Sequence, residues 1–72
     1  MTDAEVGRFL ETFRTLAQVF FLRGNEEEVT QVGESYFRIL RRFPLSAVQA
    51  GADRWLATAE RFPKPAQWIE SI

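Results

Sequence analysis

Apolar residues recur at steps of three and four in three long stretches of this chain, which is the spacing of one face of an α-helix. The first stretch starts after Thr2 or Asp3, either of which can cap a helix. We expect it to end at Arg23 and Gly24, because a cation and a left-handed glycine suit a helix terminus. Its predicted core face consists of Val6, Phe9, Leu10, Phe13, Leu16, Ala17 and Phe20.

The second stretch opens with a helix-capping signal. Asn25 can cap the helix, and the acids from Glu26 to Glu28 suit the positive end of the helix dipole. Pro44 ends the helix, because the residue before a proline is driven out of the α region. The predicted core face consists of Val29, Val32, Tyr36, Ile39, Leu40 and Phe43.

The third stretch uses the same proline near its start and is expected to end near Phe62 and Pro63. Its predicted core face consists of Leu45, Val48, Ala52, Trp55, Leu56 and Ala59. Pro65 then starts a short closing turn over residues 66–72, whose apolar members are Trp68, Ile69 and Ile72.

The connections between these stretches are short, so consecutive helices are expected to pack as antiparallel or steeply crossed neighbours. No stretch alternates with a period of two, and strands are therefore not expected. Gly33 and Gly51 lie inside predicted helices, where each costs roughly 1 kcal/mol relative to alanine, and they mark points of close helix approach. The sequence predicts one all-α domain over residues 1–72, a compact three-helix bundle with a short C-terminal fourth helical turn.

Composition agrees with a small, densely packed domain. Of the 72 residues, 46% are hydrophobic and 14% aromatic, and there is no cysteine or histidine to form a disulfide or a soft metal site. No apolar run reaches the ~18–20 residues that span a bilayer, and the acidic N-terminus does not resemble a signal peptide. We therefore expect a soluble cytoplasmic protein without a membrane partner.

The sequence contains few of the residue types that commonly act in catalysis. The commonest general base and the most reactive nucleophile are missing, since there is no histidine and no cysteine. The four glycines are too far apart for a phosphate-binding loop, and the run from Glu26 to Glu28 is explained by the helix dipole. The sequence thus favours a binding protein, with no enzymatic activity, cofactor or metal.

Basic residues provide the first candidate for a binding surface. Although the formal net charge is only −1, residues 1–36 carry a net of −4 and residues 37–72 a net of +3. Helical spacing places the basic residues of the second half on outer faces, and if the second and third helices are neighbours they form one arginine-rich patch. The alternative is an ordinary solvated face. The members are Arg38, Arg41, Arg42, Arg54, Arg61 and Lys64.

Apolar residues off the core face provide the second candidate. Val19 and Leu22 point away from the core face of the first helix, so they either widen the core or form a contact surface, including a homodimer seam. Trp55 and Trp68 could stack on bases, but their positions favour core packing.

The last part of the chain carries an ordered series of motifs. Residues 36–40 (Tyr-Phe-Arg-Ile-Leu) are followed by residues 43–48 (Phe-Pro-Leu-Ser-Ala-Val), then Trp55, then residues 61–66 (Arg-Phe-Pro-Lys-Pro-Ala). Over residues 29–72 this series resembles the small phage-type replicative helicase loader and inhibitor proteins. The resemblance implies a non-enzymatic regulator that binds a hexameric replicative DNA helicase or a related nucleic-acid machine. The alternatives are a small phage inhibitor of a bacterial defence complex and a helical DNA-binding protein.

Overall fold

The computed structural model describes all residues from 1 to 72 and contains helices but no strand, as predicted. A single 3-10 turn, Asp3–Glu5, leads into the first of four α-helices. The helices are α1 (Val6–Val19), α2 (Glu26–Leu40), α3 (Leu45–Thr58) and α4 (Pro65–Glu70). The all-α fold class is therefore confirmed, with α4 as the short fourth helix.

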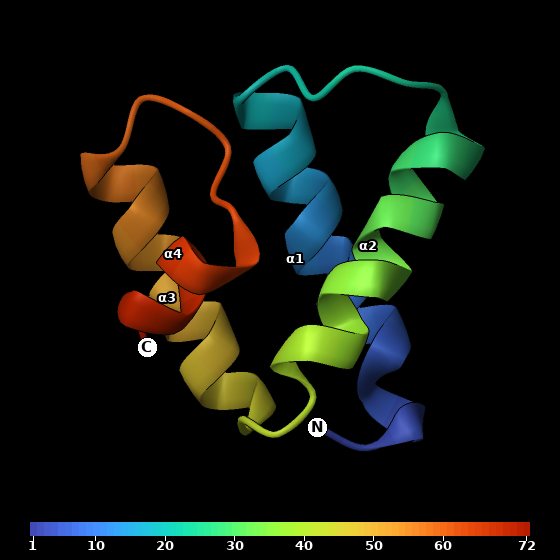
Figure 1. Cartoon of the computed structure of the whole chain (residues 1–72), viewed down its shortest axis with the longest axis vertical. Helices are drawn as coiled ribbons and strands as arrows, with labels where there is room; N and C mark the ends of the chain where they lie inside the picture. The colour runs from blue at the N-terminus through green and yellow to red at the C-terminus, as the bar shows by residue number, and fades with distance from the viewer.

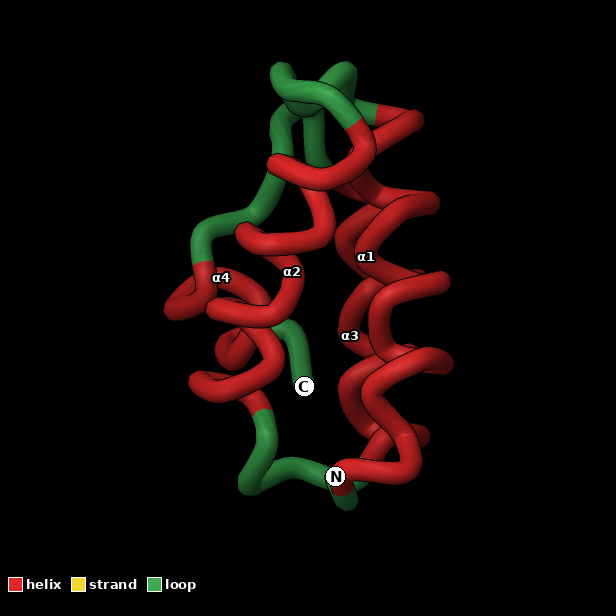
Figure 2. The backbone as a smooth tube through the Cα atoms, turned by 90° about the vertical axis from the view of Figure 1, so that its right-hand side faces the viewer, coloured by secondary structure: helices red, strands yellow, loops and turns green.

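The three long helices alternate in direction, with α1 between α2 and α3 (Figure 1). The α1–α2 and α3–α4 connections lie at one end of the molecule, and the α2–α3 connection lies at the other end, beside the N-terminus (Figure 2). The helix α1 packs against both α2 and α3, while α4 packs against α3 and α2. The short fourth helix thus closes the bundle on the side that α1 does not cover.

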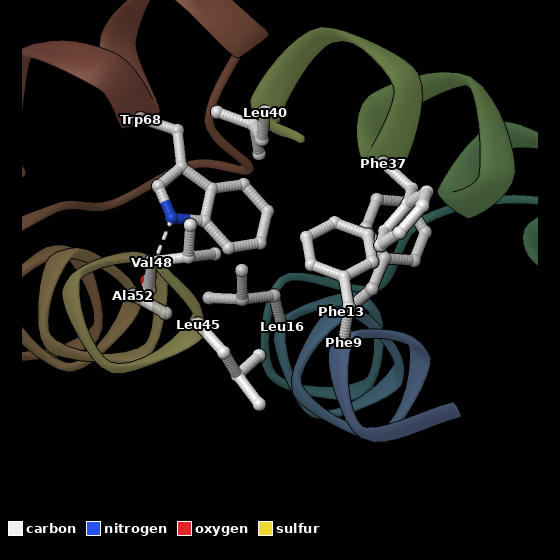
Figure 3. Close-up of a cluster of buried hydrophobic side chains, with 9 residues drawn as sticks. All are labelled: Phe9, Phe13, Leu16, Phe37, Leu40, Leu45, Val48, Ala52 and Trp68. Atoms are coloured by element: carbon white, nitrogen blue, oxygen red, sulfur yellow. Dashed lines mark hydrogen bonds between the residues drawn. The ribbon is translucent and has the colours of Figure 1, made fainter. Parts of the chain in front are cut away.

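A single apolar core holds the four helices together (Figure 3). All the buried side chains are apolar, and no buried polar side-chain atom lacks a hydrogen-bond partner. The side chain of Trp68 extends from α4 into the space between α2 and α3. Its ring stacks on the ring of Phe9, with the two centroids 5.5 Å apart. The core comprises Phe9, Phe13, Leu16, Phe37, Leu40, Leu45, Val48, Ala52 and Trp68.

Both interior glycines lie where helices approach closely, as the sequence suggested. A Cβ on Gly33 would lie 2.8 Å from Cδ2 of Leu10 and 3.0 Å from the ring of Phe13. A Cβ on Gly51 would lie 3.2 Å from Cγ1 of Ile72. The absence of a side chain at Gly33 lets α2 pack closely on α1. The absence of a side chain at Gly51 lets the C-terminal residues pack closely on α3.

The buried face of α2 differs from the predicted one. Phe37 is buried, whereas Val32 and Ile39, both assigned to the core, are 41% and 48% exposed. The reason is Gly33, which has no side chain and so adds nothing to a hydrophobic pattern, yet faces α1 directly. The buried face is centred on Gly33 and Leu40, and the predicted face was rotated away from it.

Two helix ends also differ from prediction. The helix α1 stops at Val19 and not at Gly24, and α3 stops at Thr58 and not near Phe62. Ala59, the residue after α3, has an extended backbone. The indole nitrogen of Trp55 donates a 2.6 Å hydrogen bond to the carbonyl oxygen of Arg61 and so stabilises this early exit from the helix.

The start of α2 follows the prediction closely. The side chain of Asn25 accepts a 2.9 Å hydrogen bond from the amide of Glu28, and the Glu28 carboxylate reaches back to the Asn25 amide. This reciprocal capping satisfies two backbone donors that have no partner within the helix.

None of the helices combines the length and the apolar character that crossing a membrane requires.

Candidate functional site

The six basic residues predicted to form a patch are all exposed, but they are not gathered by direct packing of α2 on α3. The main contacts of both helices are with α1 and α4, and α1 lies between them (Figure 1). The premise that the second and third helices are close neighbours was therefore wrong. Arg38 lies in the last turn of α2 and Arg41 and Arg42 directly follow the helix, whereas Arg54 lies on α3.

The three arginines at the end of α2 make contacts within the chain. Arg41 forms an ion pair with Asp3 at 2.8 Å, and because both side chains are exposed this pair contributes little to stability. The guanidinium of Arg42 lies over the ring of Phe43, 4.9 Å from its centroid. Arg38 donates a 3.1 Å hydrogen bond to the hydroxyl of Ser35.

Of the remaining basic residues, Arg61 and Lys64 lie in the α3–α4 connection and Arg54 lies on α3. Arg61 supplies the carbonyl oxygen that Trp55 binds, and the amide of Lys64 donates a 2.9 Å hydrogen bond to Oε1 of Gln67 at the start of α4. Both contacts of Arg61 and Lys64 are thus made by backbone groups that shape the loop. The side chains of Arg54, Arg61 and Lys64 are exposed.

The end of α1 has an unusual backbone. Phe21 has a φ of +53°, in the left-handed region, and is the only residue other than glycine with a positive φ. The amide of Leu22 donates a 2.9 Å hydrogen bond to the carbonyl oxygen of Ala17. The amide of Phe21 donates a 3.5 Å hydrogen bond to the carbonyl oxygen of Gln18. These two bonds are the pair that ends a helix through a left-handed residue, a position normally held by glycine.

Phe21 occupies that position at a cost. The left-handed conformation costs an L-residue with a side chain roughly 1–2 kcal/mol, and a bulky residue adopts it rarely. The side chain is also 87% exposed, so packing does not offset the strain. An exposed aromatic ring on a strained backbone is the feature of this surface that the fold itself does not explain.

The two apolar residues singled out in the sequence have different environments. Leu22 is half-buried and packs against the core, which agrees with a widened core. Val19 is 50% exposed and lies two residues before Phe21. Phe21 was not singled out from the sequence, because Gly24 was expected to end α1. Gly24 does have a positive φ of 124°, but the helix has already ended before it.

A shallow hollow lies beside Phe21, between the end of α1 and the start of α2. Arg14 bridges the two helices by donating a 3.3 Å hydrogen bond to the hydroxyl of Thr30. Half of the lining residues are apolar, so the hollow can receive an apolar side chain bordered by polar groups. The lining consists of Arg14, Ala17, Gln18, Phe21, Leu22, Gly24, Glu26 and Val29. We call this surface, together with Val19, the α1-end site.

The titrating groups with altered pKa values lie away from the α1-end site. A hydrogen bond from the backbone amide of Thr2 lowers the pKa of Glu5, and burial raises the pKa of Tyr36. The hydroxyl of Tyr36 donates a 2.9 Å hydrogen bond to the carbonyl oxygen of Pro63. These contacts hold the N-terminal turn and the α3–α4 connection in place.

The structure contains no cluster of potential metal ligands. No three histidine, cysteine, aspartate or glutamate side chains lie close enough together to hold a metal ion. The α1-end site offers apolar contact and hydrogen-bonding groups, which are the means of binding a partner surface. In comparisons with known proteins, no family model, curated protein or solved structure matches this chain.

Proposed function

We propose that this chain is a non-enzymatic regulator that binds a protein partner through the α1-end site. The observation that carries the proposal is Phe21, an 87% exposed ring at a position where glycine would be less strained. Strained backbone and exposed aromatic rings concentrate at binding surfaces, because the contact made there offsets their cost.

The geometry suits a protein partner better than a small ligand. The hollow beside Phe21 is open, and its rim carries Arg14 and Glu26 with opposite charges. Aromatic residues inserted into a partner commonly supply much of the binding energy at protein interfaces. The half-exposed Val19 enlarges the apolar centre of such a contact.

The resemblance of residues 29–72 to phage-type helicase loaders and inhibitors supplies the partner to be tested, a hexameric replicative helicase. Phe21 and Val19 make the primary contact with this partner, and Arg38, Arg42 and Arg54 form a rim that tunes the salt dependence. Charges at the edge of an interface act mainly on association rate and specificity.

The test is to titrate the labelled chain with a purified hexameric helicase and to compare Phe21→Ala with the unchanged protein. Alanine removes the ring but retains a side chain in the left-handed conformation, so any loss of binding comes from the ring. We expect affinity to fall by at least about tenfold, the equivalent of 1.4 kcal/mol. Circular dichroism should show unchanged helicity.

A triple reversal, Arg38, Arg42 and Arg54 to Glu, is the matched comparison. It should change the salt dependence more than the affinity at moderate salt. If the triple reversal abolishes binding while Phe21→Ala does not, the basic residues are the contact and the α1-end proposal is wrong. Saturable binding to duplex DNA of any sequence, with a steep salt dependence, would instead favour the DNA-binding alternative.

A further inference from the structure

The outer side of α2 carries a short apolar stripe that the rest of the chain covers only in part. Val32 and Ile39 are 41% and 48% exposed. They are seven residues apart, which places them on the same side of the helix and about 10 Å from each other along its axis. Ser35 lies between them, and its hydroxyl accepts the hydrogen bond from Arg38. The stripe is separate from the α1-end site.

Charge along α2 is strongly graded from one end to the other. Its four acids, Glu26, Glu27, Glu28 and Glu34, occupy the first two-thirds of the helix. The arginines follow at the other end, as Arg38 within the helix and Arg41 and Arg42 just after it. A second helix with the same gradient in the opposite direction would place the acids of each copy beside the arginines of the other toward both ends. The surface that best matches α2 is therefore another α2, running antiparallel.

We infer that the outer face of α2 is the seam of an antiparallel homodimer, with the twofold axis near Ser35. Glu28 and Arg42 lie seven residues before and after Ser35, so the axis brings Glu28 of one copy to Arg42 of the other. Val32 and Ile39 lie three residues before and four residues after it, so the axis also brings Val32 of one copy within one residue of the position opposite Ile39 of the other. A twofold interface repeats each of these contacts.

The direction of pairing is fixed by electrostatics. A parallel arrangement would set the acidic first turn of one helix against the acidic first turn of the other, and arginines against arginines. It would also align the two helix dipoles, whereas the antiparallel arrangement opposes them. The 15 residues of α2 span roughly 22 Å, so a single-helix seam is smaller than a standard protein interface. The dimer should therefore be reversible and dependent on concentration.

The experiment is a charge-swap complementation measured by sedimentation equilibrium. Glu28→Arg places arginine against arginine in its own homodimer, and Arg42→Glu places glutamate against glutamate. Each variant alone should dimerise at least about tenfold more weakly than the unchanged chain. An equimolar mixture restores opposite charges at both ends of the seam and should recover the association. Because Glu28 also caps α2, circular dichroism must show that each variant is folded.

The mixture uses the same two variants, so loss of the cap cannot explain a recovery. A mixture that associates no more tightly than its components, or an unchanged chain that stays monomeric at every concentration, overturns the proposal. Ile39→Asp and Val19→Asp form a matched apolar pair, since both residues are about half exposed. Dimerisation should be lost with Ile39→Asp and retained with Val19→Asp. The opposite pattern would place the seam at the end of α1 and also overturn the proposal.

Discussion

The indole nitrogen of Trp68 donates a 3.0 Å hydrogen bond to the backbone carbonyl oxygen of Val48, and both side chains are fully buried. This contact joins α4 to the middle of α3. The ring of the same tryptophan stacks on Phe9 of α1 and lies 6.2 Å from the ring of Tyr36 of α2. One side chain therefore ties together all four helices.

Replacing Trp68 with Ala should lower the free energy of unfolding by about 3–5 kcal/mol, the range for removing a buried tryptophan. That is a large share of the stability of a domain this small. Trp55→Ala is the control, and it should cost less because Trp55 is only half-buried. Urea unfolding followed by circular dichroism gives both values. A greater cost at Trp55 would contradict the burial described for the two tryptophans.

Gly33→Ala should destabilise the domain by about 1–3 kcal/mol, even though alanine is the better helix former. The added methyl group would lie 3.0 Å from the ring of Phe13, which is packed in the core. Gly7→Ala provides the matched control, because nothing lies within 4 Å of a Cβ there. It should stabilise the domain by about 0.5–1 kcal/mol. Equal effects at the two sites, measured by urea unfolding, would show that α1 and α2 are less closely packed.

Phe21→Gly should raise the free energy of unfolding by about 0.5–1 kcal/mol, because glycine adopts the left-handed conformation without strain. Phe21→Ala keeps that strain and should bring no comparable gain. Thermal and urea unfolding of the two variants separate the backbone effect from the loss of the exposed ring. If alanine stabilises as much as glycine, the backbone of Phe21 is not strained.

Stability should fall in alkaline solution because of Tyr36. Burial raises its pKa above the ordinary value of 10.0, so above this pH the phenol ionises more readily in the unfolded chain than in the folded one. The contribution of the protonated Tyr36 to the free energy of unfolding is complete below pH 10. It is lost as the pH rises through the pKa that Tyr36 has in the folded protein. Tyr36→Phe should cost about 0.5–1.5 kcal/mol at neutral pH, because the bond to Pro63 is lost, and should flatten the alkaline decline. An equally steep decline in the variant would assign it to other groups.

Local signals in the sequence were sufficient for much of the fold. The cap at Asn25, the buried face of α1 and the close approaches at Gly33 and Gly51 each depend on neighbouring residues or on simple helical spacing. Such features can be predicted because the same few residues both produce the signal and form the structure.

The candidate sites were harder to predict because they depend on tertiary arrangement. A patch joining Arg38 to Arg54 required α2 and α3 to be neighbours, and their separation by α1 is set by packing across the whole bundle. Ile39 is exposed because α2 turns the side that carries Gly33 toward α1. A glycine does not count as an apolar position, so the pattern of apolar residues could not indicate that side. The left-handed backbone of Phe21 could be found only by knowing that α1 ends at Val19 and not at Gly24.

The place of Trp68 in the core also bears on the order of events during folding. The α1–α2 hairpin can form from contacts between segments close in sequence, whereas the Phe9–Trp68 stack joins residues near opposite ends of the described chain. Contacts that need such long loop closures tend to form after local ones. Substitutions in α4 should therefore act chiefly on the rate of unfolding, while those between α1 and α2 should slow refolding. Packing of α4 through Trp68 would then determine the lifetime of the native state more than the rate at which the chain folds.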